Sequence, residues 1–192
     1  MIFLLTRNPE QDNGRIKLVS VLMDSLVPLG IREDYREFLD KIFHGLQELE
    51  IEVSDYELDH ICYRVSSRER YDYLKENLAH QHTMLSESMI YGRPIANFLL
   101  AEPMVYKKRK IRIFELPAPK PFSNYREGFE HVEFVVKGSL ENFLGQYSSL
   151  NLDLSGFNKT INRDVRISLG NAKVKFHENS LLEIINQESS LD

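Results

Sequence analysis

Two histidines and two glutamates lie at matching places in two halves of this chain. His60 precedes Glu115 by nearly the same length of chain that separates His131 from Glu183. Imidazole and carboxylate groups are ligands that iron(II), nickel, zinc, cobalt and manganese accept in proteins. Two units related by a pseudo-two-fold axis would bring these four side chains to one point. The pattern therefore predicts a divalent-metal site formed by His60, Glu115, His131 and Glu183.

The surroundings of Glu183 favour the same interpretation. This residue lies between Leu181-Leu182 and Ile184-Ile185, where an unpaired carboxylate would be costly unless a cation accompanied it. A single histidine on a strand is more often a hydrogen-bonded structural residue. Glu183 alone could also be an exposed edge residue or the partner of an arginine. The prediction depends on all four residues occurring in matched positions.

The elements that would position these residues repeat in the same order. Each histidine begins a strand-like stretch rich in β-branched and aromatic residues, which a polar helix and three further strand-like stretches follow. The predicted strands cover residues 58–65, 83–90, 95–101 and 110–116, then 131–136, 163–169, 173–177 and 181–186, with helices over 67–79 and 140–149. The sequence thus predicts an α+β fold with two βαβββ modules, residues 55–116 and 129–186, joined by a proline-rich connector.

Alternation within the two leading strands assigns their faces. Ile61 and Val132 each begin an apolar series at every second residue, so both histidines point to the opposite face. The apolar faces are expected to cover the helices, and the histidine faces to line a shared cup. Cys62 shares the face of His60.

The N-terminal region has a different pattern. Apolar residues at helical spacing predict helices over residues 15–29 and 32–50, which form an extension, residues 1–54, that packs on something else. The apolar run over residues 2–5 is too short for a membrane span or a secretory signal, which indicates a cytoplasmic protein. The single cysteine allows neither an internal disulfide nor a thiolate zinc site.

The charge balance excludes one class of partner as a first choice. The chain has 24 basic and 29 acidic residues, a formal net charge of -5. A mildly acidic chain has no general attraction for phosphate backbones, so nucleic acid is not expected as a partner. The expected partner is a small-molecule substrate, and the sequence leaves the oligomeric state open.

Four segments, read in order, resemble the YecM family within the vicinal oxygen chelate superfamily. They are Leu-Asp-His-Ile-Cys-Tyr-Arg-Val at 58–65, Tyr-Gly-Arg-Pro-Ile-Ala at 91–96, Glu-Leu-Pro-Ala-Pro-Lys at 115–120 and Glu-His-Val-Glu-Phe-Val at 130–135. The resemblance extends over residues 31–186. It implies paired βαβββ modules forming a curved mixed sheet around a metal, with the metal positions falling on His60, Glu115, His131 and Glu183.

The same resemblance implies a shared chemical step but no particular reaction. In the superfamily, two oxygen atoms of a substrate chelate the metal, which acts as a Lewis acid. An isomerase or lyase of the glyoxalase type needs a general base, and Glu115 or Glu183 could leave the metal to accept a proton. A dioxygenase needs two histidines and one carboxylate, which His60, His131 and Glu183 would supply. Four ligands favour the isomerase or lyase.

Several charged residues have two interpretations. Arg64 could bind an anionic substrate group or pair with Glu133 or another acid, and Arg93 could lie at the rim of the cup. The basic run over residues 107–110 could attract an acidic ligand, although a solvated hairpin tip is the commoner structure. The alternative function is a metal-free module of the same fold that binds and sequesters a small molecule.

Overall fold

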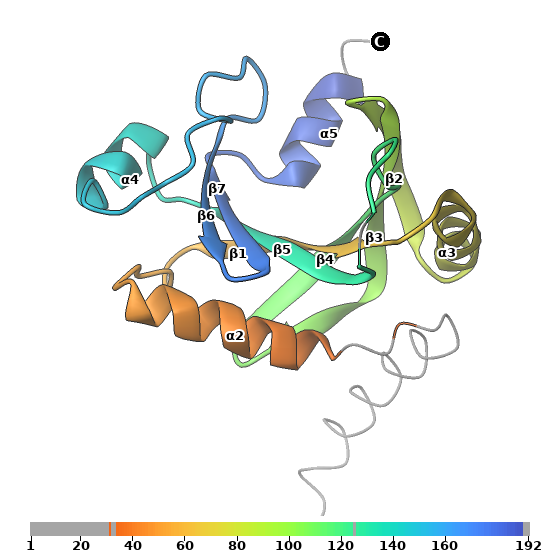
Figure 1. Cartoon of the computed structure of the whole chain (residues 1–192), viewed down its shortest axis with the longest axis horizontal. Coiled ribbons are helices and arrows are strands. Elements are labelled where there is room, and N and C mark those ends of the chain that lie inside the picture. Colours follow the sequence, from red (N-terminus) through yellow and green to blue (C-terminus); the bar gives the residue numbers. More distant parts are fainter. Residues whose placement is uncertain (1–30, 32–33, 125, 190–192) are drawn as a thin grey trace, which may run out of the picture. The chain divides into compact units, whose positions relative to one another are not determined.

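A seven-stranded mixed sheet forms the centre of the computed structural model, which describes residues 31, 34–124 and 126–189. The helix predicted over residues 15–29 lies outside the described residues. The strands occur in the order β2-β3-β4-β1-β5-β7-β6 (Figure 1). Their bounds are β1 Glu57–Arg64, β2 Thr83–Ile90, β3 Arg93–Tyr106, β4 Arg109–Pro117, β5 Gly128–Val135, β6 Asp164–Leu169 and β7 Ala172–His177.

The two leading strands lie side by side at the middle of this sheet. β1 pairs with β5 in antiparallel orientation, and each also pairs in parallel with the last strand of its own module, β4 or β7. Helix α3 (Arg68–Gln81) follows β1, and helix α4 (Leu140–Gln146) follows β5. The predicted α+β class and the duplicated order of elements are confirmed, with one exception in the second module.

The exception is the strand predicted over residues 181–186, which is wrong. This segment forms helix α5 (Leu181–Ser189), and its buried residues Leu181, Ile184 and Ile185 have helical spacing. Strand β7 is consequently the last strand of the second module. An isolated antiparallel bridge joins Asp153 to Arg166 of β6.

Helix α2 (Tyr35–Glu48) lies against one face of the sheet (Figure 1), and alternation along β5 makes this the face opposite to His131. Phe38 stacks on Phe129 with ring centroids 5.6 Å apart, and Phe43 meets Phe134 edge-on at 5.9 Å. The helix predicted over residues 32–50 is therefore present as α2, and it packs on the sheet. None of the helices in the described part of the chain is long and apolar enough to cross a membrane.

Helix α5 lies on the opposite side of the sheet from α2 (Figure 1). Its residues Leu181 and Ile185 form a buried cluster with Ile113 of β4, and Leu85 packs against this cluster. Ile113 lies two residues before Glu115 on the same strand, so both point to one face. The C-terminal helix thus covers part of the face on which the sequence places its candidate site.

Arg109, in the basic run at the β3–β4 turn, holds the loop before β1. Its guanidinium donates hydrogen bonds to the main-chain carbonyls of Val53 and Tyr56, and it lies 5.3 Å from the centroid of the Phe43 ring. Replacing Arg109 by alanine is expected to lower the free energy of unfolding by about 2–4 kcal/mol, since both carbonyls lose a charged donor. Urea denaturation measures this, with the exposed neighbour Lys108→Ala as a control that should change little.

Candidate metal centre

Each histidine of the duplicated pair follows directly on an acidic residue in a β-bulge. Asp59 is the extra residue of one irregularity between β1 and β5, and Glu130 is the extra residue of the other. His60 Nδ1 lies 2.8 Å from Asp59 Oδ2, and His131 Nδ1 lies 2.9 Å from Glu130 Oε2. In a neutral ring, a carboxylate on Nδ1 holds the proton there and leaves the lone pair on Nε2, which is the usual outer support of a metal-bound histidine.

The two Nε2 atoms face the same pair of carboxylates. Glu133 Oε1 lies 3.3 Å from His60 Nε2 and 3.2 Å from His131 Nε2. Glu115 Oε1 lies 3.5 Å from His131 Nε2. His60, His131 and Glu133 are almost fully buried, with exposed fractions of 1%, 4% and 4%. The structure therefore brings together His60, Glu115 and His131, as the sequence predicts, and adds Glu133.

Glu183, the fourth predicted ligand, lies elsewhere. It is exposed on the first turn of α5, where its carboxylate accepts hydrogen bonds from the main-chain N–H of Ser180 at 2.8 Å and from the Ser180 hydroxyl at 3.0 Å. The Ser180 hydroxyl in turn accepts from the Glu183 N–H at 3.3 Å. This reciprocal pair is a helix capping box. The roles of metal ligand and general base assigned to Glu183 from the sequence are therefore corrected.

That correction has a testable consequence. Replacing Glu183 by alanine is expected to lower the free energy of unfolding by about 1 kcal/mol through loss of the cap. Metal content should stay the same as in the unmodified protein, because the carboxylate lies outside the cluster. Thermal unfolding and elemental analysis of the same preparation measure both effects, and a loss of metal with an intact fold would contradict the placement.

A lysine occupies the position that duplication would give to the fourth ligand. The β1–β4 register places Cys62 opposite Glu115, and the β5–β7 register places Glu133 opposite Lys175. Cys62 and Glu133 each lie two residues after their histidine, so Lys175 is the counterpart of Glu115. The second carboxylate of the cluster is supplied instead by the leading strand, at Glu133.

Lys175 is part of the same buried network. Its ammonium lies 2.5 Å from Glu133 Oε1 and 3.0 Å from His131 Nε2. Burial acts to raise the pKa of Glu133, but Lys175 and His60 outweigh it and hold that pKa well below its usual range. Burial acts to lower the pKa of His60, but the carboxylates of Glu133 and Asp59 raise it to about 10. The cluster attracts positive charge strongly.

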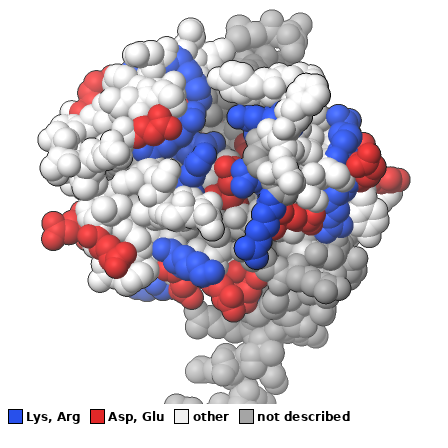
Figure 2. All heavy atoms as spheres, in the orientation of Figure 1, with Lys and Arg blue, Asp and Glu red and all other residues white. Residues whose placement is uncertain are grey.

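The two arginines predicted to bind substrate have structural partners. Arg64 Nη1 lies 3.4 Å from Glu130 Oε1, so Glu130 is one of its acidic neighbours. Arg93 donates to the main-chain carbonyl of Ala118 at 2.9 Å and holds the connector after β4. Arg64 therefore borders the cluster, whereas no contact among the described residues joins Arg93 to it. Figure 2 shows acidic and basic side chains lying next to one another in the middle of the face in view.

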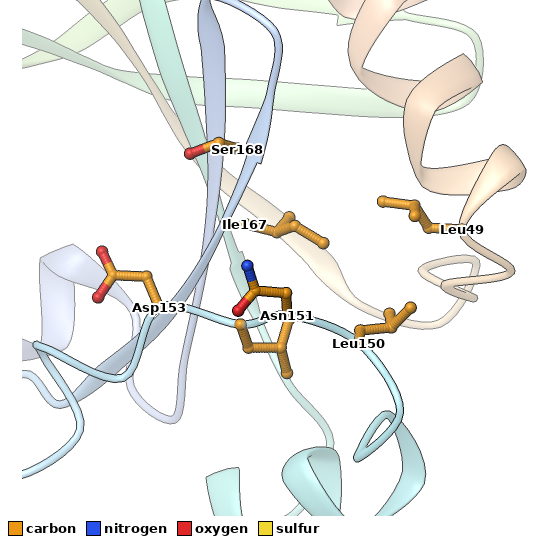
Figure 3. Close-up of a pocket in the computed structure, with 7 residues that line it drawn as sticks. Leu49, Leu150, Asn151, Asp153, Ile167 and Ser168 are labelled. Carbon is orange, nitrogen blue, oxygen red and sulfur yellow. The ribbon is translucent and has the colours of Figure 1, made fainter.

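A surface hollow of about 390 Å³ lies apart from these residues. Figure 3 shows it between the end of α2, the loop after α4 and strand β6. Its lining residues are Leu49, Leu150, Asn151, Leu152, Asp153, Ile167 and Ser168. Leucine and isoleucine predominate and Asp153 is the acidic residue, so this hollow offers no set of groups comparable with the histidine cluster.

The fold and the cluster define a class: duplicated β-α-β proteins whose paired leading strands present histidines and carboxylates on one face. A family model described as YecM protein matches residues 29–188, and the chain belongs to this family. Protein YecM of Escherichia coli (strain K12) is 29% identical over 180 residues, which cover 82% of this chain and 94% of that protein.

Two further proteins are similar to this chain. An uncharacterized protein of Haemophilus influenzae (strain ATCC 51907 / DSM 11121 / KW20 / Rd) is 34% identical over 103 residues, 54% of each chain. The solved structure titled "Structural Genomics, Protein EC4020" superposes with a TM-score of 0.71 at 28% identity and covers 83% of this chain and 91% of its own. None of these three names specifies a reaction, so the chemistry is inferred from the cluster.

Proposed function

We propose that this protein binds one divalent metal ion through His60, His131 and Glu133, with Glu115 beside it, and uses the ion on a small oxygen-rich molecule. One observation carries the proposal. The two imidazoles are both backed by a bulge carboxylate on Nδ1, and both turn Nε2 toward Glu133. Such an arrangement suits a metal ion, because once the ion displaces the Nε2 protons, two nitrogen lone pairs and a carboxylate oxygen are directed at one place.

The charges of the cluster support a single divalent ion. Asp59, Glu115 and Glu133 supply three negative charges on the inner side, and Lys175 supplies one positive charge. When a metal ion displaces the protons on Nε2 of both imidazoles, these three carboxylates and the ammonium carry a charge of about −2, which one divalent cation balances. His60 Nε2 is buried without a hydrogen-bond partner among the described residues, so the donors fit such an ion.

The residues around the ion suit proton transfer. The ion itself would supply Lewis acidity toward two adjacent oxygen atoms of the substrate. Glu133 is held by Lys175 and both histidines, whereas Glu115 has His131 as its nearest ring nitrogen, at 3.5 Å. Glu115 is therefore the better acceptor for a substrate proton, and Arg64 is placed to bind an anionic group. An isomerase or lyase reaction agrees best with this division, ahead of a dioxygenase.

A cobalt-substituted protein tests whether the ion has open coordination positions. The visible spectrum of the Co²⁺ form should change when acetohydroxamate, a small chelator with two adjacent oxygen atoms, is added. The expected change saturates at one acetohydroxamate per chain and is absent in the His60→Ala/His131→Ala variant. A Co²⁺ spectrum that acetohydroxamate leaves unaltered would show a closed structural site and exclude the proposed chemistry.

Lys175 favours a second candidate function. Its ammonium already neutralises Glu133 and contacts His131, so the cluster is partly balanced without a metal. A metal-free module that binds and sequesters a small molecule has this property. It predicts that a chelator leaves the melting temperature unchanged, whereas the metal-binding function predicts that chelation lowers it and that added Zn²⁺ restores it.

A further inference from the structure

His177 lies at the end of β7, and its two ring nitrogens have different surroundings. The residue has an exposed fraction of 1%. Its Nδ1 contacts the main-chain carbonyl of Asn179, which only accepts hydrogen bonds, so Nδ1 carries the proton. The lone pair of a neutral ring is then on Nε2. Among the described residues this atom has no hydrogen-bond partner.

Two carboxylate oxygens lie near His177 Nε2, and both are hydrogen-bond acceptors. Glu133 Oε2 lies 3.5 Å away and Asp59 Oδ2 lies 3.6 Å away. On the other side of the same carboxylate, His60 Nε2 faces Glu133 Oε1 at 3.3 Å and is likewise buried without a partner. Nε2 of His60, Nε2 of His177 and both oxygens of Glu133 thus lie together at one buried place.

We propose that His177 is a further ligand of the metal ion, together with His60 and Glu133. This inference rests on the proposed function, because it concerns the same ion. Glu133 lies between the two rings, with Oε2 3.5 Å from His177 Nε2 and Oε1 3.3 Å from His60 Nε2. Ligand atoms of His60 and His177 also lie within 4.8 Å of one another, in a group that includes Asp59. The main-chain carbonyl on Nδ1 gives His177 the outer support typical of a zinc-bound histidine.

The position of Lys175 strengthens this assignment. The ammonium occupies the His131 side of Glu133, at 3.0 Å from His131 Nε2. The His60 and His177 side contains no such cation among the described contacts. His177 also has no histidine counterpart in the first module, where the residue two positions after Glu115 is Pro117. Duplication alone therefore does not reveal it.

Nuclear magnetic resonance of the ¹⁵N-histidine-labelled protein during titration with Zn²⁺ tests the inference without any substitution. The Nε2 resonance of His177 is expected to move to the range of metal-coordinated imidazole nitrogen, while Nδ1 stays protonated. His60 should respond in the same way. Resonances are assigned with single His→Ala variants, and the exposed His44 serves as an internal control that should not respond.

Three outcomes distinguish the inference from the function on which it rests. A response of His60 and His131 but not His177, or a protonated His177 Nε2 in the Zn²⁺ form, leaves the metal function standing and overturns the inference. No response from any of the three overturns both. As a second measurement, His177→Ala should weaken Zn²⁺ binding by more than about 100-fold, beyond the loss usual for an outer-sphere partner. His44→Ala should leave the affinity unchanged.

Discussion

Replacing both His60 and His131 by alanine is expected to reduce bound metal from about one ion per chain to nearly none. These imidazoles face a common carboxylate from adjacent strands, and each is backed by its own acid on Nδ1. Loss of two such donors leaves carboxylates and at most the one imidazole of His177, and carboxylates hold nickel, zinc or cobalt far more weakly than imidazole does. Elemental analysis of protein purified without added metal measures the ratio.

The matched control is the variant His44→Ala/His80→Ala, which also removes two imidazoles but from exposed positions. It should retain the metal content of the unmodified protein. Equal metal content in the two double variants would mean that any bound metal lies outside the cluster, and the proposed function would then have no support. Circular dichroism of both variants establishes that the comparison is made between folded proteins.

Replacing Lys175 by methionine is expected to make the fold depend on metal. The ammonium lies 2.5 Å from Glu133 Oε1, and both side chains are largely buried. Removing one partner of a buried ion pair leaves the other charge uncompensated, which costs about 3–5 kcal/mol. A divalent ion at the same carboxylate would offset this loss. We therefore expect a markedly lower melting temperature without metal and a larger gain on adding Zn²⁺ than in the unmodified protein.

Lys173→Met provides the comparison for this prediction. Lys173 lies on the same strand, but its side chain is half exposed and lies 3.9 Å from Glu130. That variant should shift the melting temperature little, with or without Zn²⁺. If Lys175→Met unfolds no more easily than Lys173→Met, the ammonium does not balance the cluster. If it is destabilised but gains nothing from Zn²⁺, the metal-free module becomes the better interpretation.

The leading strands could be predicted because two independent patterns coincide in them. Alternation places His60 and His131 opposite an apolar face, and that face packs against α2 and the adjoining rings, as in the contact of Phe43 with Phe134. A register with one buried face is strongly specified. The approach of the two histidines then follows from the pairing of β1 with β5, which duplication makes plausible.

The hydrophobic pattern around Glu183 does not place this residue. A short apolar run interrupted by one acid has no unambiguous period, so strand and helix fit it equally well. The signal that favours a helix is Ser180, because Ser180 and Glu183 have the spacing of a capping box. Local hydrogen bonding at the helix start therefore prevailed over the expected third strand of the second module.

Alternation places Glu133 on the face of His131, two residues earlier, but Lys175 and the two bulge acids depend on details that periodicity does not contain. A bulge adds one residue to one strand, so Asp59 and Glu130 reach the face of their histidines although simple alternation assigns them to the other. Lys175 could have been found by aligning the last true strands of the two modules. That alignment requires knowing that β7, rather than the segment after it, is the last strand.

A crystal structure of protein loaded with one metal, with anomalous diffraction recorded on both sides of that metal's absorption edge, tests the central claim most directly. We predict one strong anomalous peak at the middle of the sheet, within bonding distance of nitrogen atoms of His60 and His131 and of an oxygen of Glu133. A structure with no peak there, with Lys175 still in contact with His131 and Glu133, would contradict the metal centre.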